Sequence, residues 1–390
     1  MHSKKKILIT ASTFPRWEHD SISSFVLYLA KDLLKYYDIY VLAPHFKGAK
    51  TYEEMDGIKV YRFKYFMDKG EVLAYGGGAV NNLKKNPFIN FLVPVYLMAN
   101  FVAILRLNLK YKFDIINVHW IVPTGLLVVL LKPFIKAKVV ITSHGGDIYG
   151  ITKNRLWSNF GLSKMISFIV NRADVLIPVS SSLKGEIEKM LKSKIPVIVC
   201  SMGIDYNRFY NERESLSNKT INKLLFVGRI APEKGITYLI EAANLLRKQH
   251  VDFHLTIAGE GPLMEEIKKM VIDYDLSENI EFLGYVKNID IPDLLRQNQV
   301  FLSTSIREGL PTAYMEAMAS GLISIVSNTL GIEDLIKTDD NGIIYEIGDI
   351  ASLVGHIKKV IADNTFGEKL IKNAQKDAKI YDWKVITKNY

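Results

Sequence analysis

Short apolar runs alternate with stretches of helical periodicity along most of the chain, which is the pattern of a parallel α/β protein. Residues 6–10 form the first run and are predicted to be a central, buried strand. Residues 25–34 follow with the spacing of an amphipathic helix. In the first half we predict further strands at 39–42, 58–61, 114–118, 139–142, 175–177 and 197–199, and helices at 124–131, 156–171 and 181–191.

A second alternation begins after a polar, aperiodic stretch at residues 207–222. Strands are predicted at 223–227, 253–258, 280–283, 300–302, 322–326 and 342–345, and helices at 236–249, 263–272, near Pro292 and at 312–319. The chain of 390 residues is long enough for two cores. We therefore predict two doubly wound α/β domains, residues 1–206 and 223–375, joined by the linker 207–222 and facing a crevice.

Composition narrows the possible partners. The net charge of +9 favours an anionic partner: a phosphate-bearing substrate, an acidic membrane surface or nucleic acid. Aromatic and basic residues are not interleaved as in nucleic-acid-binding modules, so we expect no nucleic acid partner. The single cysteine, Cys200, fits a reducing compartment, and we expect a small buried residue there rather than a nucleophile. Residues 1–6 are basic but run directly into a strand, so no signal peptide is expected.

The segment 88–105 is apolar apart from Asn90 and Asn100, and its length is at the lower limit for crossing a bilayer. Pro94 and the two asparagines weaken the case for a span, while positive charges flank the segment on both sides. Two alternatives stay equally open: a helix on a membrane surface, and a helix buried against the sheet.

Two carboxylates lie in the unit of strand, loop and helix that covers residues 300–321. Glu308 is on the loop after the strand, where open α/β sheets bind ligands, and Glu316 is about one turn into the helix. The N-terminus of that helix favours an anion. A phosphate flanked by acceptors for sugar hydroxyls fits this arrangement, although each glutamate taken alone is more often a solvated surface residue.

Two cations, Arg229 and Lys234, lie on a loop that leads from a strand to a helix. They could converge on one diphosphate, with the guanidinium as a bidentate partner; alternatively they are solvated charges that pair with Glu233. The nearby Gly259-Glu260-Gly261 lacks the third glycine of a dinucleotide-binding fingerprint, because Met264 stands in its place. We interpret it as a structural turn.

The first half offers imidazoles at the ends of two predicted strands. His144-Gly145-Gly146-Asp147 follows one strand, and His119-Trp120 ends another. They could contribute hydrogen-bonding groups to the crevice. Their spacing does not match a metal site, and there is no nucleophile elbow of a serine hydrolase and no Walker loop.

Together these motifs resemble the retaining family-4 glycosyltransferases of the GT-B fold, in which two Rossmann-like domains face a central cleft. The resemblance covers nearly the whole chain and is most specific at residues 226–235 and at Arg307-Glu308-Gly309-Leu310-Pro311 through Glu316 to Gly321. It implies an N-terminal acceptor-binding domain, a C-terminal nucleotide-sugar-binding domain, and a final helical stretch, 376–390, that crosses back to the first domain.

The resemblance also implies the roles of single residues. Arg229 and Lys234 would bind the donor diphosphate, helped by backbone N–H groups at Gly309 and Leu310. Glu316 would bind the ribose hydroxyls and Glu308 the donor sugar. On the other side, His144 would reach the sugar or the acceptor, with Asp147, His119 and Trp120 also on the acceptor side. Asp20 would lie on a loop near the acceptor.

The chain departs from the family pattern at three places. The usual glycines of the loop at Asp20 are absent, Met202 stands where the family has Asn, and Leu330 replaces one of two expected glycines. The first of these departures bears on the phosphate contacts of the Asp20 loop.

The activity implied by the resemblance is retaining transfer of a hexose from a UDP- or GDP-sugar to a lipid-linked or polysaccharide acceptor. Fixed cations near the leaving diphosphate stabilise the charge that develops there, so neither a metal ion nor another cofactor is expected. The expected location is cytoplasmic, peripheral on the inner face of the plasma membrane. An epimerase of the same fold, or a nucleotide-sugar-binding protein without transferase activity, is the alternative. The sequence leaves the sugar, the base and the linkage open.

Overall fold

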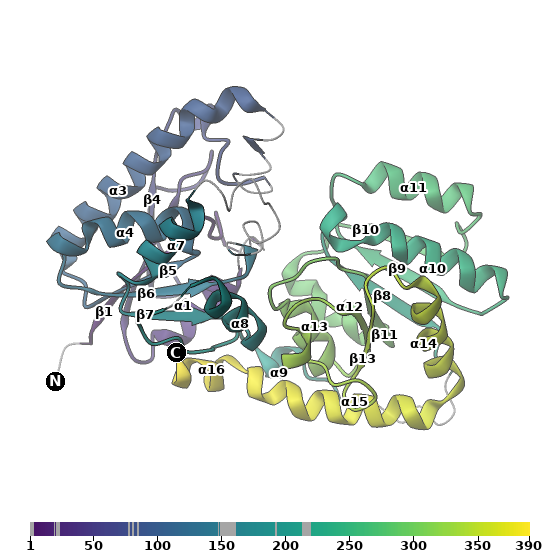
Figure 1. Ribbon diagram of the computed structural model, residues 1–390. Coiled ribbons are helices and arrows are strands. Elements are labelled where there is room, and N and C mark those ends of the chain that lie inside the picture. Colours follow the sequence, from purple (N-terminus) through teal and green to yellow (C-terminus); the bar gives the residue numbers. More distant parts are fainter. Residues whose placement is uncertain are drawn as a thin grey trace. The chain divides into compact units, whose positions relative to one another are not determined.

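The computed structural model describes residues 4–18, 20, 24–76, 79, 82–83, 86–146, 148, 161–191, 193–212 and 220–390. The chain divides into two compact units, which Figure 1 shows with their elements labelled. Unit 1 comprises Met1–Ser201 with Thr387–Tyr390, and unit 2 comprises Met202–Ile386. The chain thus passes from unit 1 to unit 2 after Ser201, before the predicted linker at 207–222. Within that linker the structure describes residues 207–212 and 220–222.

Unit 1 is built on a seven-stranded sheet of order β3-β4-β2-β1-β5-β6-β7. All neighbouring strands are parallel except β3 and β4. The strands are β1 (Lys6–Thr10), β2 (Asp38–Pro44), β3 (Tyr52–Met55), β4 (Ile58–Phe63), β5 (Ile115–His119), β6 (Lys138–Ser143) and β7 (Val175–Pro178). Most predicted strands are thereby confirmed, because apolar runs of this length are buried on both faces of a parallel sheet.

Two differences from the predicted strands have local causes. Strand β3 was not predicted; it forms a hairpin with β4 through Asp56 and Gly57, which both have positive φ, as the Asp-Gly pair of a tight hairpin allows. The predicted strand 197–199 is wrong. Val197 forms an isolated bridge with Leu176, and the ladder does not continue to Val199 because Pro178 on β7 has no N–H to donate to the Ile198 carbonyl.

Helices cover this sheet, and their bounds follow the predicted periodicity. They are α1 (Ser24–Leu33), α3 (Leu92–Tyr111), α4 (Leu126–Leu131), α7 (Leu162–Val170) and α8 (Ser181–Met190). Ser180 caps α8 by accepting a hydrogen bond from the Leu183 N–H at 3.2 Å. Of the predicted helix 156–171, residues 156–160 lie outside the described part.

Unit 2 is a six-stranded, all-parallel sheet of order β10-β9-β8-β11-β12-β13. The strands are β8 (Lys223–Val227), β9 (His254–Ala258), β10 (Ile280–Gly284), β11 (Val300–Ser303), β12 (Ile323–Ser327) and β13 (Ile343–Tyr345). The chain runs outward in one direction from β8 and then returns to begin again at β11. This is a Rossmann-like order, with its switch point between β8 and β11.

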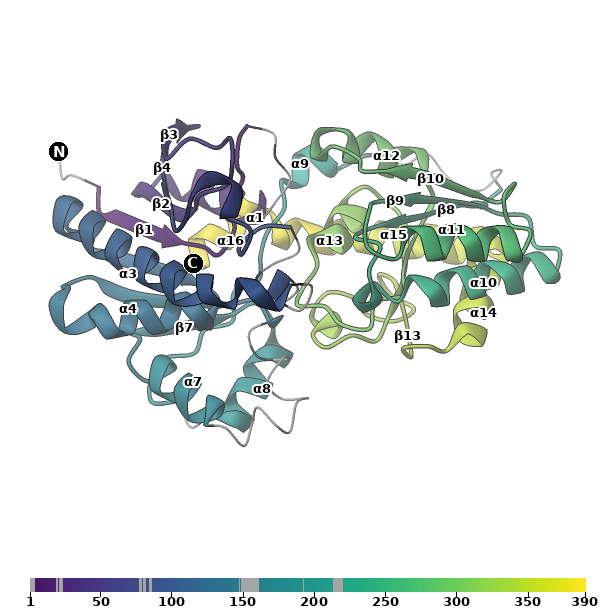
Figure 2. The same cartoon turned by 90° about the horizontal axis from the view of Figure 1, so that it is seen from above.

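The helices of unit 2 close the core on both faces of the sheet, as Figure 2 shows. They are α9 (Tyr206–Phe209), α10 (Ile236–Lys248), α11 (Met264–Asp273), α12 (Ile291–Gln297), α13 (Thr312–Ala319), α14 (Ile350–Ala362) and α15 (Asn364–Ala378). Helix α10 packs between α11 and α14, whereas α13 packs against α15 and α9. Two mostly parallel Rossmann-like sheets of this kind confirm the predicted α/β fold of the GT-B type.

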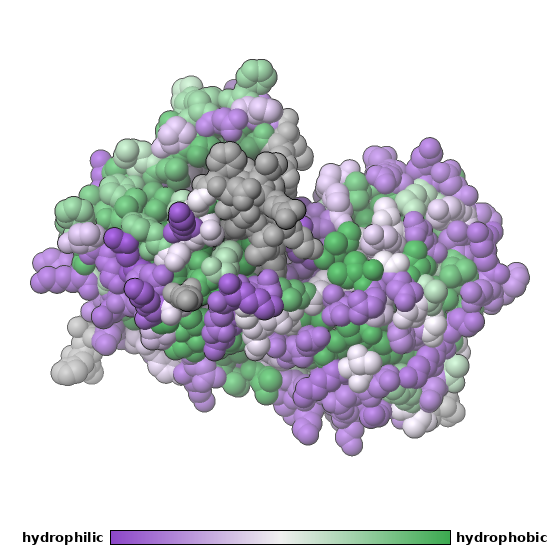
Figure 3. Space-filling model, viewed as in Figure 1, coloured by the Kyte–Doolittle hydropathy of each residue, from purple (hydrophilic) through white to green (hydrophobic). Residues whose placement is uncertain are grey.

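Helix α3, with the short turn η2 (Pro87–Phe91) before it, has two different faces. Tyr96, Asn100 and Ile104, four residues apart, are buried on the inner face, which packs against α4. The outer face exposes apolar side chains that include Phe88, Val95, Met98 and Leu109, and Figure 3 shows hydrophobic residues gathered over this part of unit 1. By length and composition, residues Pro87–Tyr111 could cross a membrane, with a mean hydropathy of 2.1 over 18 residues. Only 22% of those 18 residues are buried in the protein, so the prediction of a helix buried as a whole against the sheet is excluded.

The last helix, α16 (Trp383–Asn389), carries the chain from unit 2 to its final residues, which belong to unit 1. There the Thr387 hydroxyl contacts the Asp32 carboxylate, and the Tyr390 hydroxyl contacts Thr142 and lies 3.2 Å from Asn117 Oδ1. These polar contacts attach the chain end to β5 and β6.

The loops that follow the strands of unit 2 are packed backbone to backbone. Gly235 has a φ of 57°, and a Cβ placed on it would lie 2.1 Å from the Thr304 carbonyl oxygen. Gly259, in the turn predicted to be structural, has a φ of 147°, and its Cβ would lie 1.8 Å from the Gly228 carbonyl oxygen. Glycine at both places lets neighbouring loops approach more closely than any side chain permits.

We expect Gly235→Ala to destabilise unit 2 by more than the roughly 1–2 kcal/mol that a left-handed backbone costs an L-residue, because the Thr304 carbonyl must also move. Gly355→Ala is the control: on α14 its Cβ would meet nothing within 4 Å, and alanine favours a helix by about 1 kcal/mol. Scanning calorimetry of both variants is the measurement. A Gly235→Ala protein as stable as the wild type would refute the close packing.

Candidate active site

The central feature of unit 2 is an ion pair at the carboxyl edge of its sheet. Lys234 follows β8 and Glu308 follows β11, and because these strands are parallel neighbours, both loops emerge at the switch point. Lys234 Nζ lies 2.5 Å from Glu308 Oε1, and both side chains are largely shielded from solvent, with 24% and 11% of their surfaces exposed. The structure thus brings these two predicted site residues together.

Buried hydroxyl groups hold Glu308 in place. Ser305 Oγ donates to Glu308 Oε1 at 2.6 Å, and the Ser327 hydroxyl donates to the Ser305 carbonyl at 2.6 Å. Ser303 Oγ lies 3.2 Å from Ser305 Oγ and 2.5 Å from the Tyr314 hydroxyl. The sequence prediction missed this network, although the polar run Ser303-Thr304-Ser305 directly after a buried strand is the signal that marks it.

Arg229 lies apart from this pair. Its guanidinium pairs with the Glu233 carboxylate, and about 40% of each side chain is exposed. This is the alternative that the sequence left open for Arg229. An exposed pair of this kind contributes less than about 1 kcal/mol, so Arg229 can exchange Glu233 for another anion at little cost.

Glu316 lies in the second turn of α13, and its carboxylate makes no hydrogen bond or ion pair with any residue that the structure describes. Burial raises the pKa of its carboxyl to about 7, and the positive charge of Arg208 offsets part of this effect. A buried carboxylate is stable only with donors nearby. The side chain is therefore poised to accept hydrogen bonds from a ligand.

The loop between Glu308 and α13 offers backbone donors. Among the described residues, neither the Gly309 nor the Leu310 N–H finds an acceptor, and α13 has no side-chain cap at its start. These N–H groups and the helix start favour an anion in the same region as Lys234.

In unit 1, His119 and His144 form a hydrogen-bonded pair. His119 ends β5 and His144 follows the neighbouring strand β6, so the two rings meet at one edge of the sheet. His119 Nδ1 lies 2.9 Å from His144 Nε2, and Trp120 and Phe25 pack on the His144 ring with centroids at 4.9 and 5.1 Å. Burial lowers the pKa of His144 to about 3 and lowers that of His119 as well, so both rings are neutral.

The hydrogen bonding assigns the protons of this pair. His119 Nε2 is buried and has no partner, and an unpaired acceptor is tolerated better in a protein interior than an unpaired N–H. His119 therefore carries its proton on Nδ1 and donates it to His144 Nε2. His144 must then be protonated on Nδ1, which meets no acceptor among the described residues and can donate to a ligand.

Asp20 pairs with an arginine of its own loop. Both of its carboxylate oxygens accept from Arg16, Oδ2 from Nε at 2.7 Å and Oδ1 from Nη2 at 3.1 Å. Arg16 in turn lies over the rings of Trp17 and Phe46. These contacts fix the position of the Asp20 carboxylate within its loop, and its place near an acceptor stays a prediction. The second acidic candidate of this unit, Asp147, lies outside the described residues.

Two further features, a cluster of possible metal ligands and the single cysteine, are accounted for by the fold and need no functional role. The described residues include one cluster with the geometry of a metal site, His45, Asp68 and Glu71. However, His45 Nδ1 faces the Glu71 carboxylate and Nε2 faces the Ala49 carbonyl at 2.8 Å, which leaves no ring nitrogen for an ion. Cys200 is buried as predicted, and burial raises the pKa of its thiol to about 11, which disfavours the thiolate.

Comparison with known families assigns both halves of the chain. Residues 22–208 match the sequence model described as Glycosyltransferase Family 4. Residues 207–377 match the one described as Glycosyl transferases group 1. The two matches follow each other along the chain and together span both units.

Individual relatives have low sequence identity to the chain but align over more than half of its length. The chain is 27% identical, over 68% of its length and 71% of the relative's, to the UDP-Gal:alpha-D-GlcNAc-diphosphoundecaprenol alpha-1,3-galactosyltransferase of Escherichia coli. Matches to two other curated relatives, from Escherichia coli and Salmonella typhimurium, span 60% and 58% of those proteins' own lengths.

Solved structures share the fold of the whole chain. Sucrose-phosphate synthase from Thermosynechococcus elongatus matches with a TM-score of 0.80 at 17% identity, over 98% of this chain and 96% of that one. HepE from Anabaena, in complex with UDP and glucose, matches with a TM-score of 0.73 at 17% identity, over 98% and 97%.

The proton assignment of the histidine pair predicts opposite outcomes for two substitutions at one position. Asparagine can place an N–H where His119 has Nδ1, whereas glutamine places its amide where His119 has Nε2. We expect His144 to keep its Nδ1–H form in His119→Asn and to lose this preference in His119→Gln. The ¹⁵N shifts of the labelled histidines, with His144→Gln for assignment, measure this; an unchanged His144 in the glutamine variant would contradict the assignment.

The raised pKa of Glu316 predicts a pH-dependent stability difference. Burial favours the neutral carboxyl, so the native state loses stability as the pH rises from the usual glutamate range to about 7. Glu316→Gln stays neutral and avoids this loss. The stability of the variant relative to wild type should therefore increase by up to about 3 kcal/mol between pH 4.5 and 7.5 in denaturant titrations. A difference that is independent of pH would show that Glu316 titrates normally.

Proposed function

The chain belongs to the family-4 glycosyltransferases, with a group 1 domain as its second half, and we propose that it transfers a hexose from a nucleotide-diphosphate sugar to a lipid-linked or polysaccharide acceptor. The observation that carries this proposal is the 2.5 Å pair of Lys234 and Glu308 at the switch point of unit 2. A fixed cation, a carboxylate and backbone N–H groups that meet no acceptor in the described part of the chain lie there, where a doubly wound sheet binds its ligand.

The ion pair suggests how the donor is received. A diphosphate is a stronger partner for Lys234 than one carboxylate, so binding of the donor exchanges Glu308 for phosphate oxygens. Glu308 is then released, still held by Ser305, to accept from hydroxyl groups of the sugar. As the glycosidic bond breaks, negative charge develops on the leaving diphosphate, and Lys234, Arg229 and the N–H groups of Gly309 and Leu310 stabilise it.

Glu316 is proposed to bind the ribose. Two neighbouring hydroxyl groups would donate to its carboxylate and supply the partners that the protein does not. Because only the ionised carboxylate accepts two such bonds, nucleotide affinity should depend on the ionisation of Glu316.

Unit 1 is proposed to receive the acceptor. His144 offers a neutral Nδ1–H donor, and the ring of Trp120 beside it suits the apolar face of a sugar. Arg229 and Lys234 supply positive charge at the leaving group, so the proposed mechanism requires no metal ion, and it retains the anomeric configuration by attack from the face that the diphosphate leaves.

The proposed location is the cytoplasmic face of the membrane. The exposed apolar side of α3 and the net charge of +9 both suit a surface of anionic lipids. A lipid-linked acceptor is also supported by the name of the Escherichia coli relative, whose acceptor is a diphosphoundecaprenol.

An epimerase or a non-catalytic nucleotide-sugar-binding protein of the same fold is the second candidate, and turnover separates it from a transferase. We expect the purified chain to release UDP or GDP from one member of a panel of nucleotide sugars in the presence of membrane lipid extract. Lys234→Ala and Glu308→Ala should each lower kcat/KM by about 10²–10³-fold, as expected when a group that stabilises the transition state is lost.

Lys372→Ala, at an exposed position of α15, is the matched control and should keep full activity. The anomeric configuration of the product, read by proton NMR, tests retention. Full activity of both site variants would refute the assigned site, and nucleotide binding without release from any sugar would favour the binding protein.

A further inference from the structure

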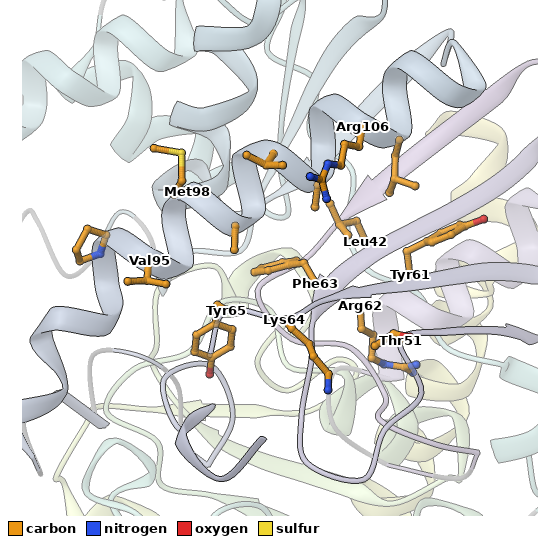
Figure 4. Close-up of a pocket in the computed structure, with 15 residues that line it drawn as sticks. Leu42, Thr51, Tyr61, Arg62, Phe63, Lys64, Tyr65, Val95, Met98 and Arg106 are labelled. Carbon is orange, nitrogen blue, oxygen red and sulfur yellow. The ribbon is translucent and has the colours of Figure 1, made fainter. Parts of the chain in front are cut away.

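A groove of about 900 Å³ lies between α3 and the edge of the sheet in unit 1. Figure 4 shows Val95 and Met98 on one wall, from the helix, and Phe63 and Tyr65 on the other, at the end of β4. Its volume is in the range of sites that bind small organic molecules. The groove lies wholly within unit 1 and contains none of the site residues described above.

Small side chains on the helix create this hollow. Ala99 and Ala103, one turn apart, line it between the larger Val95, Met98 and Val102. With only a methyl group each, the two alanines leave the space that longer side chains would fill against Leu42 and Phe63. The walls are therefore apolar and shaped by the sequence of one helical stripe.

Charge is available at the rim of this groove and not inside it. Arg106 ends the helical stripe, is exposed, and makes no hydrogen bond or ion pair with a described residue. Lys64, on the opposite wall, pairs only with the exposed Asp68 at 2.7 Å, which is a weak contact. Arg62 also lines the groove, but its guanidinium is already bound by Glu53 and by the carbonyls of Lys50 and Pro15.

This combination fits an amphiphile better than a peptide. An extended peptide needs a strand edge to pair with, whereas β4 is already paired on both sides, with β2 and β3. The helix wall likewise has its backbone groups bonded internally. A hydrocarbon chain needs no hydrogen bonds, and a phosphate attached to it would meet Arg106 at the end of the groove.

We propose that this groove binds the hydrocarbon chain of the lipid-linked acceptor, with the phosphate of that lipid at Arg106. The inference rests on the proposed function in its lipid-linked form. The exposed Phe88 and Phe91 continue the apolar surface from Val95 and Met98, so a chain can reach the groove along a continuous hydrophobic path.

Farnesyl phosphate is the probe, because it joins an isoprenoid chain to a phosphate and needs no knowledge of the glycan. By calorimetric titration, we expect the full chain to bind it at least about tenfold more tightly than farnesol or inorganic phosphate. Ala103→Phe, which fills the hollow, and Arg106→Glu should each weaken binding at least about tenfold. Leu109→Ser, on the same helix but outside the groove, should not change it.

Flotation with phosphatidylglycerol-containing vesicles separates the acceptor lipid from bulk lipid. Ala103→Phe should still float, because the outer face of α3 is intact; if it loses both flotation and farnesyl phosphate binding, the groove holds bulk phospholipid and the proposal is overturned. Ala99→Leu is a second filling variant, and thermal unfolding confirms that each variant is folded. Farnesyl phosphate binding unchanged in folded filling variants would also overturn it.

These outcomes are independent of the transfer reaction. Farnesyl phosphate binding is measured without a nucleotide sugar, and release of UDP or GDP is measured through the residues of unit 2. If farnesyl phosphate does not bind in the groove, the proposed donor chemistry of unit 2 is unaffected. If no nucleotide sugar is turned over, the groove can still be a lipid-phosphate site.

Discussion

The ion pair between Lys234 and Glu308 is the contact on which the geometry of unit 2 depends. Removing two charges from water is costly, and the cost is recovered only if the charges are held close with their other positions satisfied. The structure meets this condition by packing the loops after β8 and β11 backbone to backbone at Gly235 and by hydrogen bonding Glu308 to Ser305. In the proposed function, the same pair holds in place the cation that an anionic donor would meet.

Local pattern was sufficient to predict most elements of the fold. The strands of unit 2 and helix α13 are where apolar spacing places them, because each is buried by a parallel sheet whose period the sequence follows. The strand expected at 197–199 fails because a single proline removes a donor at a sheet edge. The hairpin of β3 and β4 was not predicted because the short strand β3 is half polar. The Asp56-Gly57 pair is nevertheless a turn signal that indicates it.

The candidate site was less predictable, for a physical reason. The sequence identifies Lys234, Glu308 and the two histidines by their places after strands. The groups that contact these side chains, however, lie on other loops, which the local pattern does not reveal. Whether Arg229 turns to Glu233 or to a ligand, and which nitrogen of His144 carries the proton, depends on contacts across neighbouring strands. Asp20 is the exception: its partner Arg16 is only four residues away, and the opposite charges at this spacing could have been recognised.

The two faces of α3 decide how this chain can meet a lipid. A helix that crosses a bilayer must satisfy its polar side chains within the hydrocarbon, and α3 carries Asn100 and Asn108 on one side. Both amides are buried against unit 1, while the opposite side exposes Val95, Met98 and Leu109. Removing the inner face from the unit would expose both the amides and the core beneath them. The inner face of the helix therefore belongs to the fold of unit 1, and only its outer, apolar face is available to a partner.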